Sequence, residues 1–186
     1  MKNKHIIFII FFFIISFNSK TVLSNEFIFE SNKIEIYDNG NLIKANDGIA
    51  KSIKNNFFIS AKKFEYNKSS FILMAFNGIA KYPEKKVEIK ANKFEYFEKK
   101  SLVKAYGEVV LNDFLNNITI TSSEISYNIK SGALTSQEES IISDDSGNVF
   151  LSSNFIYKRP QKLVKITDAT LTDKQKNIYK ISRGFI

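Results

Sequence analysis

The sequence predicts an all-β fold, an elongated open β-jellyroll built from two-strand repeats of about 30 residues. Three observations predict it. Apolar and polar residues alternate along short segments, as they do when one face of a strand is buried. Similar segments recur at a regular spacing along the chain. No helical pattern of useful length follows residue 24.

The N-terminal segment has the layout of a secretory signal peptide. Lys2 and Lys4 precede an apolar run at residues 6–17, and small or modest side chains precede a cut before Asn25. The run is shorter than the roughly 20 apolar residues that span a bilayer, although a retained membrane anchor is the alternative. We therefore expect a signal peptide at residues 1–24 and one jellyroll domain at residues 25–186.

The composition excludes several kinds of chemistry. The chain has no Cys, and its single His, His5, lies in the expected signal peptide. The exported protein then lacks the side chains of His-based acid–base catalysis, Cys nucleophiles and the usual zinc and copper sites. We expect no enzymatic activity, no cofactor and no metal. An exported chain whose only arginines are Arg159 and Arg183 is not expected to bind nucleic acid.

The repeat is visible when the segments that begin at Phe27, Phe57, Val87 and Ile118 are aligned. Equivalent positions then hold similar side chains. One column contains Phe29, Ile59, Ile89, Ile120 and Phe150, a second contains Ile34, Phe64, Phe94, Ile125 and Phe155, and a third contains Ile36, Tyr66, Tyr96, Tyr127 and Tyr157. Five units cover residues 27–173, and the fourth becomes polar and irregular at residues 132–145.

The alternation slips once inside each unit. Phe94 follows the apolar Ala91 by three residues instead of two, and the other units repeat this slip. A one-residue slip would turn the later side chains to the opposite face. We therefore expect a bulge or bend that keeps them on one face. Gly78 and Gly107, in the second strand of their units, indicate a kink or a close backbone approach.

Units of this kind must stack, because one bent hairpin cannot bury its apolar face alone. Stacking in chain order gives two facing walls around a continuous apolar interior, with unpaired strands at the two ends. The alternatives are a closed barrel and a parallel β-solenoid.

Residues 57–82 and 87–111 resemble the OstA-like repeat of lipopolysaccharide transport proteins. In residues 87–111, VEIKANKFEYFEKKSLVKAYGEVVL, the pattern is an apolar–alanine–tyrosine strand, a short polar turn, and a strand with alanine, glycine and valine. Residues 118–132 match only the first strand of this pattern, and the first unit has Ile36 in the tyrosine column. The family contains the periplasmic bridge protein LptA and the N-terminal domain of the outer-membrane protein LptD.

The resemblance implies a periplasmic protein whose interior holds the lipid A acyl chains of lipopolysaccharide. It also implies head-to-tail stacking with other jellyroll proteins into a bridge between the inner and outer membranes. Three alternatives remain. The chain is a truncated N-terminal domain of LptD, a secreted structural or adhesive β-repeat protein, or a carbohydrate-active enzyme that uses Glu65 and Glu95. The third is disfavoured because these two glutamates occupy equivalent repeat positions.

Two sets of candidate functional residues follow. Those expected to face inward and line the lipid-binding interior are Phe29, Ile34, Ile36, Ile59, Phe64, Tyr66, Ile89, Phe94, Tyr96, Val109, Ile118, Ile120 and Ile125. Those expected on partner-binding edge strands are Phe27, Ile28, Phe29, Ile178, Tyr179 and Ile181. The hydroxyls of the tyrosine column either meet lipid headgroups at the rim or, as amphipathic strand residues do, reach water.

Overall fold

The structure is a computed structural model that describes residues 20–23 and 26–185. These residues form one antiparallel sheet of 13 strands. The strands are β1 (Lys20–Leu23), β2 (Phe27–Tyr37), β3 (Leu42–Ser52), β4 (Phe58–Asn67), β5 (Ile72–Tyr82), β6 (Val87–Phe97), β7 (Leu102–Asp113), β8 (Ile118–Asn128), β9 (Ala133–Ser136), β10 (Ser140–Asp144), β11 (Val149–Lys158), β12 (Leu163–Thr172) and β13 (Ile178–Phe185). Short 3₁₀ turns lie at Asp38–Gly40, Pro83–Lys85, Glu98–Lys100 and Arg159–Gln161.

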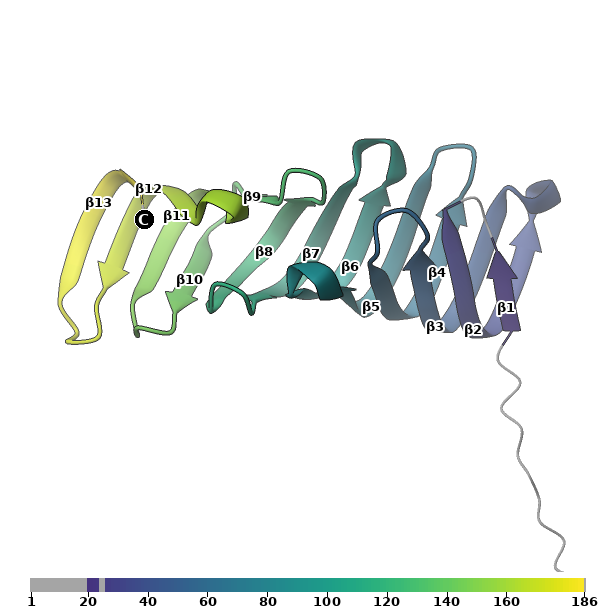
Figure 1. Ribbon diagram of the computed structural model, residues 1–186, viewed down its shortest axis with the longest axis horizontal. Coiled ribbons are helices and arrows are strands. Elements are labelled where there is room, and N and C mark those ends of the chain that lie inside the picture. The colour runs from purple at the N-terminus through teal and green to yellow at the C-terminus, as the bar shows by residue number, and fades with distance from the viewer. Residues whose placement is uncertain (1–19, 24–25, 186) are drawn as a thin grey trace, which may run out of the picture.

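The strands lie side by side in chain order along the long axis of the molecule, from β1 at one end to β13 at the other (Figure 1). The order departs from the sequence only at β9 and β10. β10 pairs with residues 118–122 of β8, and β9 pairs with residues 126–128 of the same strand. Together they replace one long strand that residues 137–139 interrupt, which accounts for the irregular segment expected at residues 132–145.

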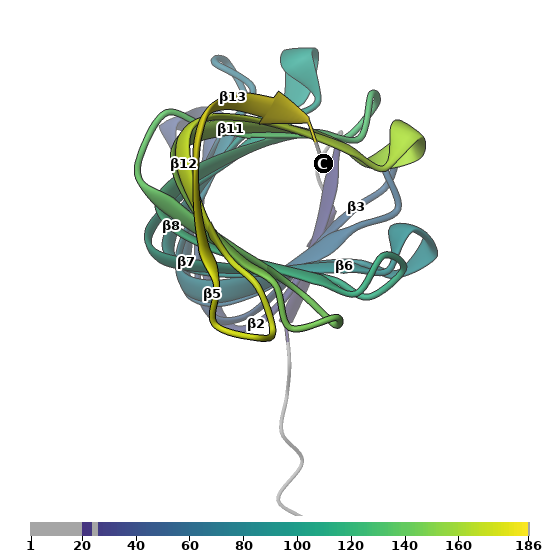
Figure 2. The same cartoon turned by 90° about the vertical axis from the view of Figure 1, so that its left-hand side faces the viewer.

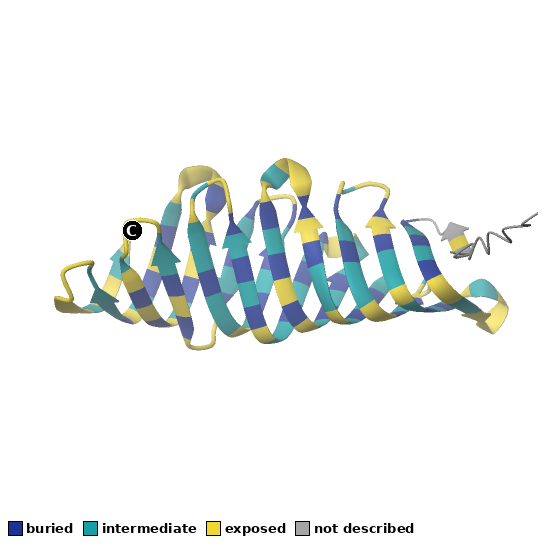
Figure 3. Cartoon of the chain, turned by 90° about the horizontal axis from the view of Figure 1, so that it is seen from below, coloured by how far each residue is buried: buried dark blue, intermediate teal, exposed yellow. Residues whose placement is uncertain are grey.

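Each long strand bends where the sequence slips. Ala61 pairs with Gly78 and Lys63 with Phe76, so Lys62 and Asn77 fall outside the ladder. Asn77 adopts a left-handed conformation with φ of 52°. Because one residue is skipped on each strand, Ile59 and Phe64 stay on the buried face on either side of the bend. The predicted bulge is confirmed here, and Figure 3 shows buried and exposed residues alternating along the strands.

Glycine at the bend permits close contact between neighbouring strands. A Cβ atom on Gly78 would lie 2.5 Å from the carbonyl oxygen of Ser60, which is well inside van der Waals contact. Gly48 in the preceding unit approaches the carbonyl of Glu30 in the same way. These positions accept no larger residue without separating the strands.

The bends curl the sheet around the long axis (Figure 2). The buried side chains form a single core cluster that extends from Phe27 in β2 to Ala169 in β12. The all-β open jellyroll predicted from sequence is confirmed. Because every pairing is antiparallel, the parallel β-solenoid is wrong for the described residues.

The turns between strands form two rows that face each other across one side of the roll. We call the line between them the seam. The first row comprises residues 38–41, 68–71, 98–101, 129–132 and 159–162, and the second comprises residues 53–57, 83–86, 114–117, 145–148 and 173–177. Throughout residues 26–185, strand pairing joins only neighbours in the sheet and never crosses the seam.

The expected signal peptide lies outside the described residues except for β1. β1 pairs with residues 28–31 of β2. In residues 20–23 and 26–185, no helix has the length and apolar character that crossing a membrane requires.

Replacing Gly78 by alanine is expected to lower the free energy of unfolding by about 1–3 kcal/mol, because the new methyl group forces β4 and β5 apart. Thermal and urea unfolding measure the change. Asn77→Gly is the matched control, since it relieves a left-handed conformation at the adjacent residue. Equal stability of Gly78→Ala and the unchanged chain would contradict the close approach.

Candidate functional site

The apolar interior is the largest candidate site, and its own side chains fill it. Ten of the proposed lining residues are at most 1% exposed; they are Phe29, Ile59, Phe64, Tyr66, Ile89, Phe94, Tyr96, Val109, Ile120 and Ile125. Aromatic rings from non-neighbouring strands touch across the interior, with Phe27 of β2 5.5 Å from Tyr96 of β6 between ring centroids. An acyl chain therefore finds room only when the walls move apart.

The other three proposed lining residues are less buried. Ile34 and Ile118 are partly buried and pack against the core. Ile36 lies on the inner face, opposite the buried Ile43, but is 56% exposed. The reason is its place in the sheet. The pairing of β1 with β2 ends at Ser31, so the second half of β2 is an edge with no outer neighbour among the described residues.

The two expected edge strands differ in the structure. Phe27 and Phe29 are fully buried in the core, and β1, which belongs to the expected signal peptide, covers the edge of β2 beside Ile28. Cleavage before Asn25 would remove β1 and free it. At the other end, β13 pairs with β12 and with no other strand among residues 20–23 and 26–185. Its Ile178 and Tyr179 are exposed, and Ile181 is partly buried against the core.

A first polar cluster closes the seam near the N-terminal end. Asn55, in the second row of turns, donates from Nδ2 to the hydroxyl of Tyr96 at 2.8 Å and to Oε1 of Glu26 at 3.3 Å. Ser52 donates to the same glutamate oxygen at 2.6 Å. Lys54 lies 3.4 Å from Glu98, in the first row of turns. We call Glu26, Ser52, Asn55 and Tyr96 the first clamp.

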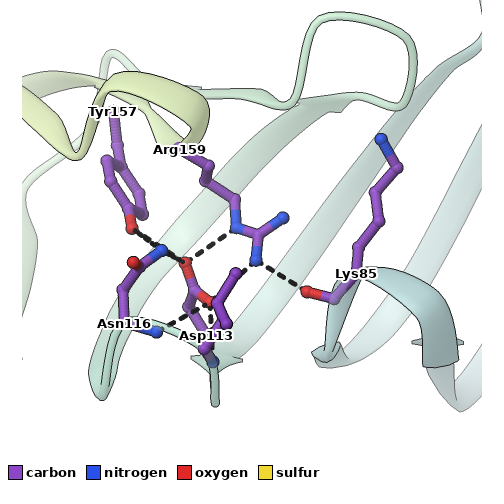
Figure 4. Close-up of polar contacts among 6 residues, drawn as sticks. Lys85, Asp113, Asn116, Tyr157 and Arg159 are labelled. Atoms are coloured by element: carbon purple, nitrogen blue, oxygen red, sulfur yellow. Dashed lines mark hydrogen bonds and ion pairs between the residues drawn. The ribbon is translucent and has the colours of Figure 1, made fainter.

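A second cluster closes the seam nearer the C-terminal end (Figure 4). Asn116 donates from Nδ2 to the hydroxyl of Tyr157 and to Oδ2 of Asp113, both at 2.8 Å. Arg159 donates from Nε and Nη2 to the two Asp113 oxygens at 2.7 and 2.8 Å. It also donates to the carbonyl of Lys85 at 2.7 Å. We call Asp113, Asn116, Tyr157 and Arg159 the second clamp.

The second clamp contains a buried ion pair between Asp113 and Arg159. The side chains of Arg159 and Asp113 are 7% and 0% exposed. Burial by itself would raise the pKa of Asp113, but hydrogen bonds from Arg159, Asn116 and Tyr157 outweigh it and lower that pKa to about 2. A buried pair of this kind is weak evidence for stability, but removing one partner is costly because it leaves the other charge unpaired.

Between the clamps, the seam is closed mainly by rings. Tyr82 at the end of β5 and Tyr127 at the end of β8 contact each other edge to face, with centroids 5.0 Å apart. Lys85 donates from Nζ to the carbonyl of Ile129 at 3.0 Å, which also crosses the seam. We call Tyr82, Lys85 and Tyr127 the middle position.

The tyrosine column thus differs from the expectation that its hydroxyls reach water. Tyr66, Tyr96, Tyr127 and Tyr157 are at most 1% exposed. The hydroxyl of Tyr66 donates to Glu98 at 3.1 Å and that of Tyr157 donates to Asp113 at 2.8 Å. Sequence reasoning missed the partners of these hydroxyls. The one available signal was the recurrence of asparagine at residues 55 and 116 of the repeat.

The paired glutamates considered for catalysis do not converge on a site. Glu65 and Glu95 lie on the outer face, where each forms an ion pair with the lysine two residues before it, at 2.7 and 2.6 Å. No group of His, Cys, Asp and Glu side chains in residues 20–23 and 26–185 is arranged to hold a metal ion.

The fold is similar to that of a solved periplasmic protein. LptH from Pseudomonas aeruginosa, described as the LptA-homologous periplasmic component of the conserved lipopolysaccharide transport device, superposes with a TM-score of 0.56. The match covers 67% of this chain and 93% of LptH, at 12% sequence identity. No family model and no curated protein matches the chain. LptH is a transport component, and the likeness extends to the fold.

The second clamp predicts a stability change in acid. Because the pKa of Asp113 is lower in the folded chain than its ordinary 3.8, its stabilising effect is present above that value and is lost as the pH falls toward about 2. The change amounts to about 2 kcal/mol. Urea unfolding between pH 5 and 2 measures it, and Asp113→Asn should flatten the dependence.

Asp145→Asn is the matched control, because Asp145 is exposed and its substitution changes the net charge equally. An unchanged acid dependence in Asp113→Asn would contradict the role of the clamp.

Proposed function

We propose that this protein is a periplasmic carrier that shields the lipid A acyl chains of lipopolysaccharide in its apolar interior. It is exported by its signal peptide, as the sequence predicts, and catalyses no reaction. It passes the lipid to other jellyroll proteins that form a bridge between the inner and outer membranes. The observation that carries the proposal is the apolar core that runs along a sheet with the fold of LptH.

The interior suits acyl chains by its chemistry. Each methylene group transferred from water to an apolar environment gains about 0.8 kcal/mol. Aliphatic and aromatic side chains such as Ile59 and Phe64 of β4 and Ile89 of β6 supply that environment. Lipid binding replaces contacts among these side chains, so the walls must separate to admit a chain.

The seam is where the walls separate. Elsewhere, neighbouring strands are held by backbone ladders, as between β5 and β6. Across the seam, the contacts are rings and side-chain hydrogen bonds such as those of the first clamp. Separating these contacts leaves the ladders intact. A lipid whose chains occupy the interior can then keep its hydrated head outside the seam.

The ends of the roll suit stacking. β13 has one free edge, and its Ile178, Tyr179 and Phe185 are 68%, 49% and 66% exposed. A strand from another jellyroll protein can add to this edge by backbone hydrogen bonds. An edge that carries exposed apolar side chains is not protected against such pairing.

Photocrosslinking from the interior tests lipid carriage. A photoreactive residue in place of Phe64 or Phe94 is expected to crosslink to lipopolysaccharide in cells, because both side chains face the interior. The same residue in place of Lys62 or Lys90, which are exposed, is the matched control and should give no such product. Immunodetection of the lipid on the purified chain measures the yield.

Equal yields from the interior and exposed positions, or no product from either interior position, would count against carriage.

Substitution of the β13 side chains tests stacking. The triple variant Ile178→Lys, Tyr179→Lys and Phe185→Lys is expected to weaken end-to-end association at least tenfold, because it adds charge to the free edge. Sedimentation velocity over a range of protein concentrations measures the association. Ile141→Lys with Leu151→Lys changes exposed residues on the sheet face and serves as control. Unchanged association of the triple variant would rule out stacking through β13.

A further inference from the structure

The two clamps are the same structure repeated along the seam. Asn55 bonds the hydroxyl of Tyr96, and Asn116 bonds that of Tyr157; in both pairs the residues are 41 positions apart. In the repeat alignment, the unit between them places Lys85 where the asparagines stand and Tyr127 where the tyrosines stand. The middle position is therefore a clamp in which the asparagine has been replaced.

A second substitution accompanies the first. Ser52 and Asp113 occupy one repeat position, and each belongs to the polar core of its clamp. The residue at that position in the middle unit is Tyr82. Both the hydrogen-bond donor and the polar residue of the clamp are thus missing here.

As a result, two tyrosine hydroxyls are buried without partners. Tyr82 and Tyr127 are 2% and 0% exposed, and within the described residues neither hydroxyl oxygen has a partner at hydrogen-bonding distance and angle, although the Arg159 guanidinium lies close enough to Tyr127 to act against the rise in its pKa. Lys85 is turned away, because its Nζ donates to the carbonyl of Ile129. A buried hydroxyl without a partner destabilises the fold relative to a phenylalanine of the same shape. Two of them in contact indicate a site whose partner comes from outside the chain.

The protonation of these two hydroxyls indicates which ligand groups they bind. Burial raises the pKa of Tyr82, and it raises the pKa of Tyr127 despite the nearby charge of Arg159. Both hydroxyls therefore stay protonated and act as donors. The suitable partner is an acceptor that enters an apolar environment, such as a carbonyl oxygen on a hydrocarbon chain.

The surroundings of the middle position are amphipathic. On the inside, the ring of Phe57 stacks on Tyr82 with centroids 5.1 Å apart. On the outside, a pocket of about 260 Å³ opens on the seam beside the second clamp, and its lining includes Lys85 and Lys130, Arg159 with its charge paired to Asp113, and Glu84 as the acidic residue. A ligand here meets apolar rings, then hydroxyl donors, then an excess of positive charge.

We propose that the middle position binds the polar junction of an acylated, phosphorylated sugar, with Tyr82 and Tyr127 donating to the ester or amide carbonyls that join its chains to its head. The proposal rests on the proposed function and specifies where along the seam the lipid sits. The first and second clamps keep the seam closed at their own positions, so the polar head of the lipid emerges between them.

Binding of two matched synthetic probes to the full chain tests the proposal. One probe is a glucosamine phosphate with one ester-linked and one amide-linked chain. The other is its analogue with ether and alkylamine linkages, which has the same chains but no carbonyls. Tyr82→Phe with Tyr127→Phe is expected to weaken binding of the first probe about tenfold or more and to leave binding of the second unchanged.

Two controls keep the result interpretable. The double variant is expected to unfold at the same temperature as the unchanged chain or higher, because it removes unpartnered hydroxyls. Tyr106→Phe removes a hydroxyl that bonds Glu95 on the outer face, and should alter binding of neither probe.

The outcomes separate this proposal from the proposed function. Equal affinity of the double variant and the unchanged chain for the carbonyl probe overturns the role of the two hydroxyls while leaving lipid carriage intact. Equal weakening for both probes also overturns it, because the effect would then come from packing. Failure of the unchanged chain to bind either probe overturns the proposed function together with this inference.

Discussion

The structure depends on a bend that every long strand must make without turning its apolar face outward. Side chains alternate with a period of two, so a simple bend would leave half of each strand facing the wrong way. Lys62 and Asn77 are both left out of the ladder, so the apolar side chains on either side of the bend stay on the buried face of both strands. Glycine at residue 78 then lets the strands meet at the bend. The curl, the single interior and the two rows of turns all follow from this correction.

Closing the roll is a separate problem, and the chain solves it with side chains. Backbone ladders hold one strand to the next, while the seam is held by rings and by two clamps of hydrogen bonds. The clamps differ in composition, because the four residues of the second include the buried ion pair of Asp113 and Arg159. Backbone ladders thus hold the sheet together, and side-chain contacts alone hold the seam, and the proposed carriage of acyl chains would use this difference.

Sequence predicted the parts of this structure that repeat. The apolar columns, the bulge and the buried positions of Phe64 and Phe94 follow from periodicity alone, since each is set by neighbours within one unit. The exposure of Ile36 was not predictable from its column, because it depends on where the pairing of β1 ends. The partners of the tyrosine hydroxyls were missed for a related reason. They come from turns 41 residues away, across a seam that a strand pattern does not represent.

The filled interior has a consequence for the energy of the proposed lipid transfer. In the proposed function, an incoming acyl chain would take the place of contacts that the protein's own side chains make with each other. The net affinity would then be the difference between the contacts that the acyl chain gains and those that the protein loses. In the proposed bridge, each jellyroll protein would bind and release the lipid with little net change in free energy. A modest input of energy at one end would then suffice to move lipid along all of them.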